Sequence, residues 1–243
     1  MSKHAVLNNI DHQALKVSTR RSAEFGDAVM CSALYPVEYR AAQACYPIVF
    51  HALADQKTMA AFALLGLEQN ENLFLQDGEW MADYLPLSVR RDPFLIGFQQ
   101  DFTSAQPHSS MVIHVDLASP RLSDSEGQPL FLPQGAPSAY TEEMASVLQT
   151  IHREQASNKA FIDTLQRHQL LEPFELDYTL HEQQKRLSGF STINEQTLAA
   201  LDKDLVFSLQ QQGYLALIYY VLASQANIAR LIKRKAQFND RLL

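Results

Sequence analysis

Two groups of residues in this sequence have types and spacings that suit chemistry, and the first lies between Trp80 and Arg91. Trp80 and Tyr84 offer aromatic faces that hold planar or cationic groups. Arg90 and Arg91 follow them closely, and guanidinium groups bind carboxylates and phosphates through paired hydrogen bonds. These four side chains predict a pocket for a small acidic or aromatic ligand. The alternative is that the rings pack in the core while the arginines pair with nearby carboxylates.

The second group is an H-x-D pattern formed by His114 and Asp116. Both residues fall in a predicted strand, where side chains two positions apart point to the same face. With one more histidine they would resemble the two-His-one-carboxylate site of non-haem iron oxygenases. The distant histidines that could complete the site are His152, His168 and His181. The alternative is an ordinary strand with a polar face, because this pattern arises readily by chance in a chain with eight histidines.

The common catalytic signatures are missing from the sequence. It contains no GxGxxG, GxxxxGK[ST], HExxH or GxSxG pattern, and its eight glycines are not clustered. These absences weigh against a nucleotide-driven enzyme and an α/β-hydrolase, and we expect no cofactor. The two cysteines, Cys31 and Cys45, are too few for a disulfide framework or a four-thiolate zinc site, which favours a reducing cytoplasm.

Charge and hydropathy narrow the class of protein further. A formal net charge of −7 argues against a nucleic-acid-binding protein, which normally carries a concentrated basic surface. The first residues lack the apolar segment and cleavage site of a secretory signal. The longest apolar run, 214–223, is about half the length that a membrane span requires. We therefore expect a soluble protein with no membrane span.

The pattern along the chain predicts an α+β fold with a mixed or antiparallel sheet, flanking helices and a helix-rich C-terminal half. After a loose segment at 1–14, we expect a single domain at 15–243. The expected strands are 46–50, 59–67, 72–75, 94–98, 111–117, 174–180 and 187–193, with a turn at Asp77-Gly78. The expected helices are 35–44, 86–91, two separate parts within 141–168, then 194–212 and 224–238.

The segment 214–222 is apolar on both alternating sets of positions, as in a central strand buried on both faces. A buried helix is the alternative, so the sequence leaves this element open. The leucines from Leu198 to Leu209, together with Phe161 and Leu165, stand at helical spacing and are expected in the core.

Three stretches resemble the bacterial SapC-like family: YPIVF (46–50), ALLGLEQNENLFLQDGEW (63–80) and YLPLSVRRDPF (84–94). The similarity continues through Asp116, through LSGFSTINEQTL (187–198) and to the end of the chain. The family pattern is matched at Asn72, Trp80, Tyr84, Pro86, Arg90, Pro93 and Phe94. His114 departs from this pattern, which weakens the metal interpretation.

The resemblance implies which genes lie near this one, but it implies no reaction mechanism. Such proteins are often labelled peptide-transport permeases, which this sequence contradicts, and they tend to be encoded near halogenase-like flavoproteins, cupin-like oxygenases and outer-membrane receptors. We therefore expect a cytoplasmic, non-catalytic accessory or ligand-binding protein with a halogenase-like or oxygenase partner. Its ligand or partner surface would include Asn72, Trp80, Tyr84, Arg90 and Arg91. The alternatives are a metal-dependent oxygenase that uses His114 and Asp116, and a structural subunit of a complex.

Overall fold

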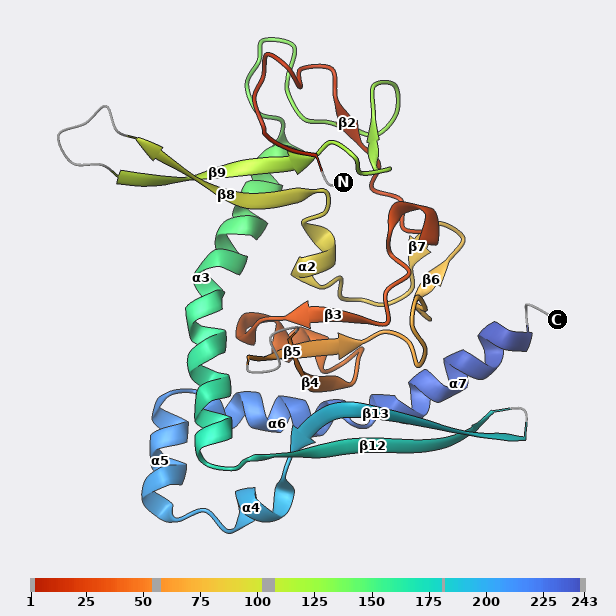
Figure 1. The fold of residues 1–243 in the computed structure, drawn as a ribbon, viewed down its shortest axis with the longest axis vertical. Helices are drawn as coiled ribbons and strands as arrows, with labels where there is room; N and C mark the ends of the chain where they lie inside the picture. Colours follow the sequence, from red (N-terminus) through yellow and green to blue (C-terminus); the bar gives the residue numbers. More distant parts are fainter. Residues whose placement is uncertain (1–2, 54–57, 102–107, 181, 241–243) are drawn as a thin grey trace. The chain divides into compact units, whose positions relative to one another are not determined.

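The computed structural model describes residues 3–53, 58–101, 108–180 and 182–240 (Figure 1). The chain forms two compact units, each assembled from separate stretches of sequence. Unit 1 comprises Met1–Asp27, Gln76–Glu79 and Leu87–Arg153, and unit 2 comprises Ala28–Leu75, Trp80–Pro86 and Glu154–Leu243. Antiparallel sheets and helices occur together, with most helices in the C-terminal half, so the predicted α+β class is confirmed.

Unit 1 is organised around a three-stranded antiparallel sheet with the order β1-β9-β8. Its strands are β1 (His4–Val6), β8 (Phe94–Asp101) and β9 (His108–Asp116), so two predicted strands are confirmed and extended. The one-turn helix α2 (Leu87–Arg90) ends before the cis Asp92-Pro93 bond, where the sequence predicted a break.

A smaller sheet completes the strands of unit 1. It has the order β10-β2-β11 and consists of β2 (Lys16–Val17), β10 (Leu122–Ser123) and β11 (Gln128–Pro129). A 3-10 turn at Ala23–Phe25 follows β2.

The predicted Asp77-Gly78 turn joins β6 (Leu75–Gln76) to β7 (Glu79–Trp80). Both turn residues have positive φ, 53° and 83°, as a two-residue hairpin turn of type I′ requires. The predicted strand at 72–75 is wrong, because only its last residue is extended. The Asn72 side chain instead accepts a hydrogen bond of 3.0 Å from the backbone N–H of Phe74 and forms a local turn.

Unit 2 contains a five-stranded antiparallel sheet with the order β12-β13-β4-β5-β3. The strands are β3 (Cys31–Leu34), β4 (Ile48–Ala52), β5 (Met59–Leu64), β12 (Leu171–Leu180) and β13 (Gln183–Ile193). Four of them were predicted, while β3 was not. The predicted connection between β4 and β5 falls at 54–57, outside the described residues.

The helical predictions are correct in place but not always in extent. Pro36 begins a 3-10 turn, Pro36–Glu38, that leads into α1 (Tyr39–Ala42). The helix predicted in two parts is one continuous 29-residue helix, α3 (Ala139–Arg167). The helix predicted at 194–212 is instead two, α4 (Glu195–Ala199) and α5 (Lys203–Gln211), because Asp202 caps a new N-terminus.

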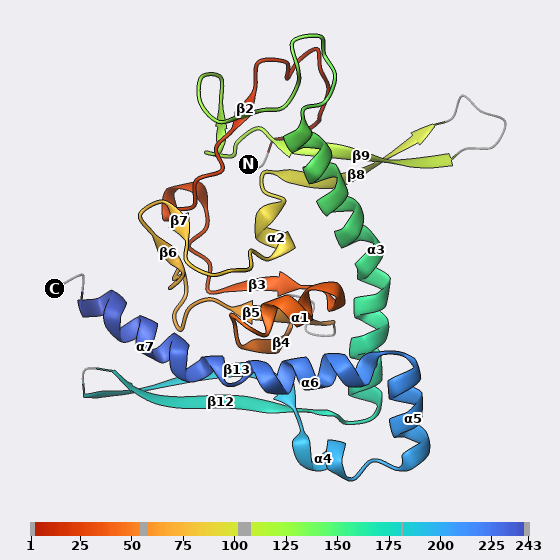
Figure 2. The same cartoon turned by 180° about the vertical axis from the view of Figure 1, so that it is seen from behind.

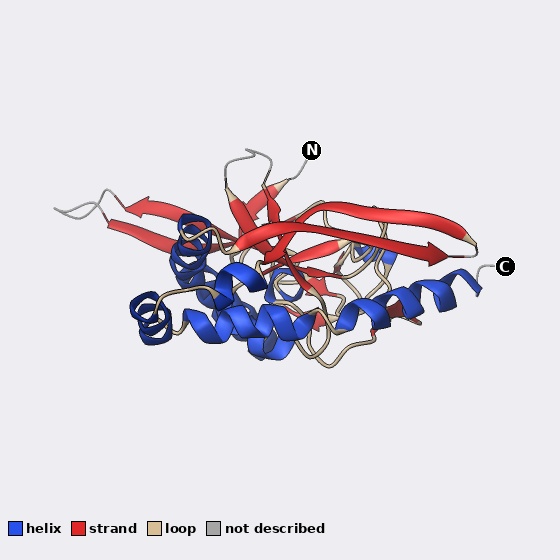
Figure 3. Ribbon diagram, turned by 90° about the horizontal axis from the view of Figure 1, so that it is seen from below, coloured by secondary structure: helices blue, strands red, loops and turns tan. Residues whose placement is uncertain are grey.

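The ambiguous segment is a helix, α6 (Tyr214–Ser224), and the interpretation as a central strand is wrong. A two-residue turn separates it from α7 (Asn227–Asp240), and both helices lie to one side of the β12–β13 hairpin (Figures 2 and 3). The helix predicted at 224–238 begins at Asn227, and Ser224 is the last residue of α6. The Ser224 hydroxyl accepts a hydrogen bond of 2.9 Å from the Ile48 N–H and donates one of 2.6 Å to the Val221 carbonyl. This serine ties α6 to the start of β4.

The core of unit 2 lies between the five-stranded sheet and its helices. Phe50 and Leu64 from the sheet, and Phe161, Leu165 and Ile218 from α3 and α6, are completely buried there. Leu209 is also buried, while Leu198, Leu201 and Leu205 are partly buried against the same cluster, so their predicted core role is confirmed.

Candidate functional site

The predicted aromatic residues Trp80 and Tyr84 belong to an internal hydrogen-bond chain in unit 2. The Trp80 Nε1–H donates to the Tyr46 hydroxyl at 2.7 Å, and that hydroxyl donates to the Tyr84 carbonyl. The Tyr84 hydroxyl in turn donates to Glu38 Oε1 at 2.9 Å. Both predicted rings pack against the hydrophobic core, and burial raises the pKa of Tyr46. Their polar atoms therefore have a structural role.

The predicted arginines lie in unit 1 and are engaged there. Arg90 pairs with Glu143, and both side chains are nearly half exposed (42% and 47%), so the pair contributes little to stability. Arg91 donates a hydrogen bond of 2.7 Å to the Phe94 carbonyl and lies 4.0 Å from Asp92. Asn72 is buried in unit 2, so the five residues fall in separate units. A common ligand surface for them stays a prediction.

The H-x-D residues are placed on β9, as the sequence predicted. The His114 ring lies over Gly97 of β8, so close that a Cβ at Gly97 would stand 2.2 Å from the ring. Asp116 accepts a hydrogen bond of 3.0 Å from the Ala118 N–H. Within residues 3–53, 58–101, 108–180 and 182–240, no three His, Cys, Asp or Glu side chains gather where a metal could bind.

Of the histidines proposed as a third ligand, His152 packs its ring against Phe98 at 5.3 Å, and His181 lies outside the described residues. The described part of the chain therefore supplies no third ligand for a metal.

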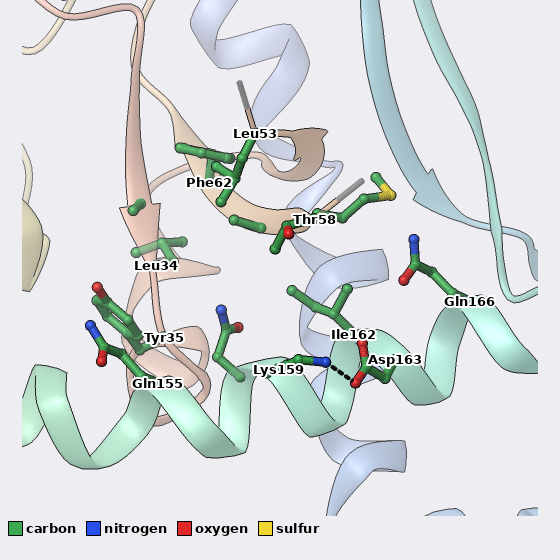
Figure 4. Close-up of a pocket in the computed structure, with 14 residues that line it drawn as sticks. Leu34, Tyr35, Leu53, Thr58, Phe62, Gln155, Lys159, Ile162, Asp163 and Gln166 are labelled. Atoms are coloured by element: carbon green, nitrogen blue, oxygen red, sulfur yellow. Dashed lines mark hydrogen bonds and ion pairs between the residues drawn. The ribbon is translucent and has the colours of Figure 1, made fainter. Parts of the chain in front are cut away.

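Unit 2 contains a groove of about 460 Å³ between its sheet and the C-terminal half of α3 (Figure 4). The volume lies within the range of small-molecule sites. The apolar wall comes from β3, β5 and α3 and includes Leu34, Met59, Phe62 and Ile162. A partly apolar ligand of the size of a small metabolite could be held here.

The α3 side of this groove also carries a polar stripe. It consists of Gln155, Asn158, Lys159, Asp163 and Gln166. These positions recur every three to four residues, so they share one face of the helix. The Lys159 and Asp163 side chains form an exposed ion pair at 2.5 Å, which balances their charges. The groove thus combines apolar contact with neutral hydrogen-bonding groups.

Asn158 is the most informative polar residue of the groove. Its Oδ1 is buried, yet it has no hydrogen-bond partner among the residues that the structure describes. A buried acceptor without a partner lowers stability, so a ligand N–H or O–H placed here would relieve that cost.

The sequence pattern does not indicate this groove. The polar run 152–159 predicts a gap between two helices, whereas it continues α3 and places Gln155, Asn158 and Lys159 along the groove. The available signal was the helical spacing of the polar residues between Gln155 and Gln166.

Unit 1 contains a smaller cavity of about 280 Å³, lined in part by His4, Asp92, Asp116 and Arg121. Beneath it, Arg121 and Asp27 form a buried ion pair at 2.5 Å, with exposures of 1% and 2%. The Arg121 guanidinium also donates hydrogen bonds to Asp27 and to the carbonyls of Ser18 and Arg20, so we attribute a structural role to Arg121.

Among the described residues, one stretch is long and apolar enough to cross a membrane: Tyr214–Asn239, which includes α6 and most of α7. Of its most apolar window, 28% is buried within the protein. This stretch is longer than the apolar run 214–223 on which the expectation of no membrane span depends, so that expectation stays a prediction.

The fold and the groove define an α+β protein with a small-molecule-sized site on its larger sheet. The SapC family model matches residues 7–231, nearly the whole chain, and the protein belongs to the SapC family. No curated protein and no solved structure matches this chain.

Proposed function

We propose that this protein is a non-catalytic ligand-binding protein that holds a small, partly apolar molecule in the groove of unit 2. The observation that carries the proposal is the buried Asn158 acceptor beside an apolar wall of Leu34, Phe62 and Ile162. The sequence suggested an acidic or aromatic ligand. An aromatic ring with an amide or hydroxyl donor suits this groove better, since its one described cation pairs with Asp163.

Ligand-observed NMR with a panel of small aromatic amides, phenols and aromatic acids tests this proposal. Ala60→Trp places a large ring in the groove and is expected to abolish binding. Ala200→Trp, at an exposed position after α4, is the matched control and is expected to bind normally. If no panel member binds the wild type, or if a ligand that binds the wild type binds Ala60→Trp equally well, the proposal is wrong.

Asn158→Leu separates a binding role from a structural one. Removal of a buried acceptor without a partner is expected to stabilise the protein by about 1 kcal/mol. The same change is expected to weaken binding of amides and phenols by about tenfold, while ligands without a donor lose little. Thermal unfolding and NMR titration measure the two effects. A loss of stability without any change in affinity would assign Asn158 to the fold alone.

The family resemblance suggests that the ligand-bound protein serves a halogenase-like or oxygenase partner in the cytoplasm. Affinity isolation from the native host, with mass spectrometry of retained proteins and small molecules, tests this part separately. A stoichiometric flavoprotein or oxygenase would support the accessory role. Recovery of a small molecule alone would support ligand binding and count against the partner.

A further inference from the structure

The α6 helix carries no charged residue, and only part of its surface is used by the core. Ile218, Val221 and Ser224 are buried, whereas Ala216, Tyr219 and Ala223 are exposed. Tyr219 is 55% exposed, and Phe207 on the neighbouring α5 is 65% exposed. An aromatic and small-residue surface therefore remains open to solvent on this helix.

Basic residues continue this surface along α7. Tyr219 and Ala223 are four residues apart on α6, and Arg230 and Lys233 are three residues apart on α7, so each exposed pair shares one side of its helix. Arg40 is exposed on α1, which packs against α6. We call the exposed residues Arg40, Phe207, Ala216, Tyr219, Ala223, Arg230 and Lys233 the α6–α7 face.

The charge of this segment opposes that of the whole chain. Between Tyr214 and Asn239 there are four basic residues and no Asp or Glu, although the chain has a net charge of −7. One of the four, Lys235, is buried against Glu68 and Glu71, which leaves the others nearer the surface. Exposed aromatic residues close to Lys and Arg side chains are a combination found in helices that lie in a membrane interface.

The internal contacts of α6 and α7 oppose a span through the bilayer. Insertion would withdraw Lys235 from its two carboxylates and Ser224 from the Ile48 N–H. It would also expose core contacts of Ile218, Val221 and Leu231. A two-fold dimer through the same face would bring cations together, because this stretch offers no carboxylate to pair with them.

We propose that the α6–α7 face binds reversibly to an anionic membrane surface, with both helices parallel to it. Tyr219 and Phe207 enter the headgroup region, while Arg230 and Lys233 contact lipid phosphates. This site is separate from the groove and does not depend on a ligand there.

Co-sedimentation of the full chain with phosphatidylcholine vesicles, with or without about one-third phosphatidylglycerol, tests the proposal. Binding is expected only with the anionic vesicles, and high salt is expected to weaken it strongly. The double variant Arg230→Glu/Lys233→Glu is expected to lose at least tenfold in partitioning, and Tyr219→Ser about threefold.

The control Lys3→Glu/Arg167→Glu has the same net charge but changes exposed residues on elements that carry none of the α6–α7 face. It is expected to lose much less binding than the test variant. Equal losses in both double variants would overturn the proposal, as would absence of binding to anionic vesicles at low salt. Concentration-dependent self-association without lipid, abolished by Arg230→Glu/Lys233→Glu, would assign the face to a second copy of the chain instead. Unchanged circular dichroism confirms that each variant is folded.

Discussion

Trp80 and Tyr46 are joined by a hydrogen bond of 2.7 Å from the indole N–H to the phenolic oxygen. The bond ties β7 to Tyr46, which lies just before β4. The Tyr46 hydroxyl in turn donates a hydrogen bond to the Tyr84 carbonyl. The only tryptophan of the chain is thus bonded to a buried tyrosine, so replacing Trp80 is expected to lower the stability of the fold.

Trp80→Phe is expected to lower the free energy of unfolding by about 1–2 kcal/mol, because it removes the donor to Tyr46 and some packing. Chemical denaturation followed by circular dichroism measures the loss. Combined with Tyr46→Phe in a double-mutant cycle, the pair should show a coupling of about 1 kcal/mol. Additive effects would mean that the two residues do not stabilise each other.

Lys235→Met is expected to destabilise the protein by about 3 kcal/mol, because it leaves the buried Glu71 carboxylate without its cation. The Lys235 side chain is only 4% exposed. Lys233→Met, on an exposed side of the same helix, is the control and should change stability by less than about 0.5 kcal/mol. Adding Glu71→Gln to Lys235→Met should restore part of the loss. Similar effects of the two single variants would contradict a stabilising buried pair.

The pH dependence of stability should depend on Glu68, which accepts hydrogen bonds from Lys185 and Lys235. These bonds hold the pKa of the Glu68 carboxyl below its ordinary value of 4.5. A lowered pKa in the folded state gives stability that is present above pH 4.5 and lost as pH falls through the folded pKa. The difference in unfolding free energy between wild type and Glu68→Gln should therefore shrink below that pH. A constant difference from pH 7 to pH 3 would be inconsistent with this linkage.

In unit 1, Arg121→Lys is expected to lower the unfolding free energy by about 3 kcal/mol, since lysine cannot reproduce the hydrogen bonds to Asp27 and two carbonyls. Faster amide hydrogen exchange around Ser18 and Arg20 would locate the damage. Arg90→Lys is the control, because its pair with Glu143 is exposed and should matter by less than about 0.5 kcal/mol. Equal losses would contradict the structural role assigned to Arg121.

Local signals in the sequence determined several elements correctly. Asp77-Gly78 marks its hairpin because both residues tolerate positive φ, Pro36 begins its turn, and Asn194 caps a helix through a bond to the Thr197 N–H. Each of these depends on neighbours within a few residues. The alternating apolar positions of 174–180 indicated β12 for the same reason.

Tertiary structure decided the features that depend on contacts between residues far apart in the sequence. The apolar run 214–222 suits a buried strand or a buried helix equally well, and Ser224 bonding to Ile48 is part of what makes it a helix against β4. Trp80 and Tyr84 looked free for a ligand because Tyr46 and Glu38, their partners, are 34 and 46 residues distant. The groove exists only where α3 approaches the sheet, so the sequence did not indicate that Phe62 and Asn158 line the same site.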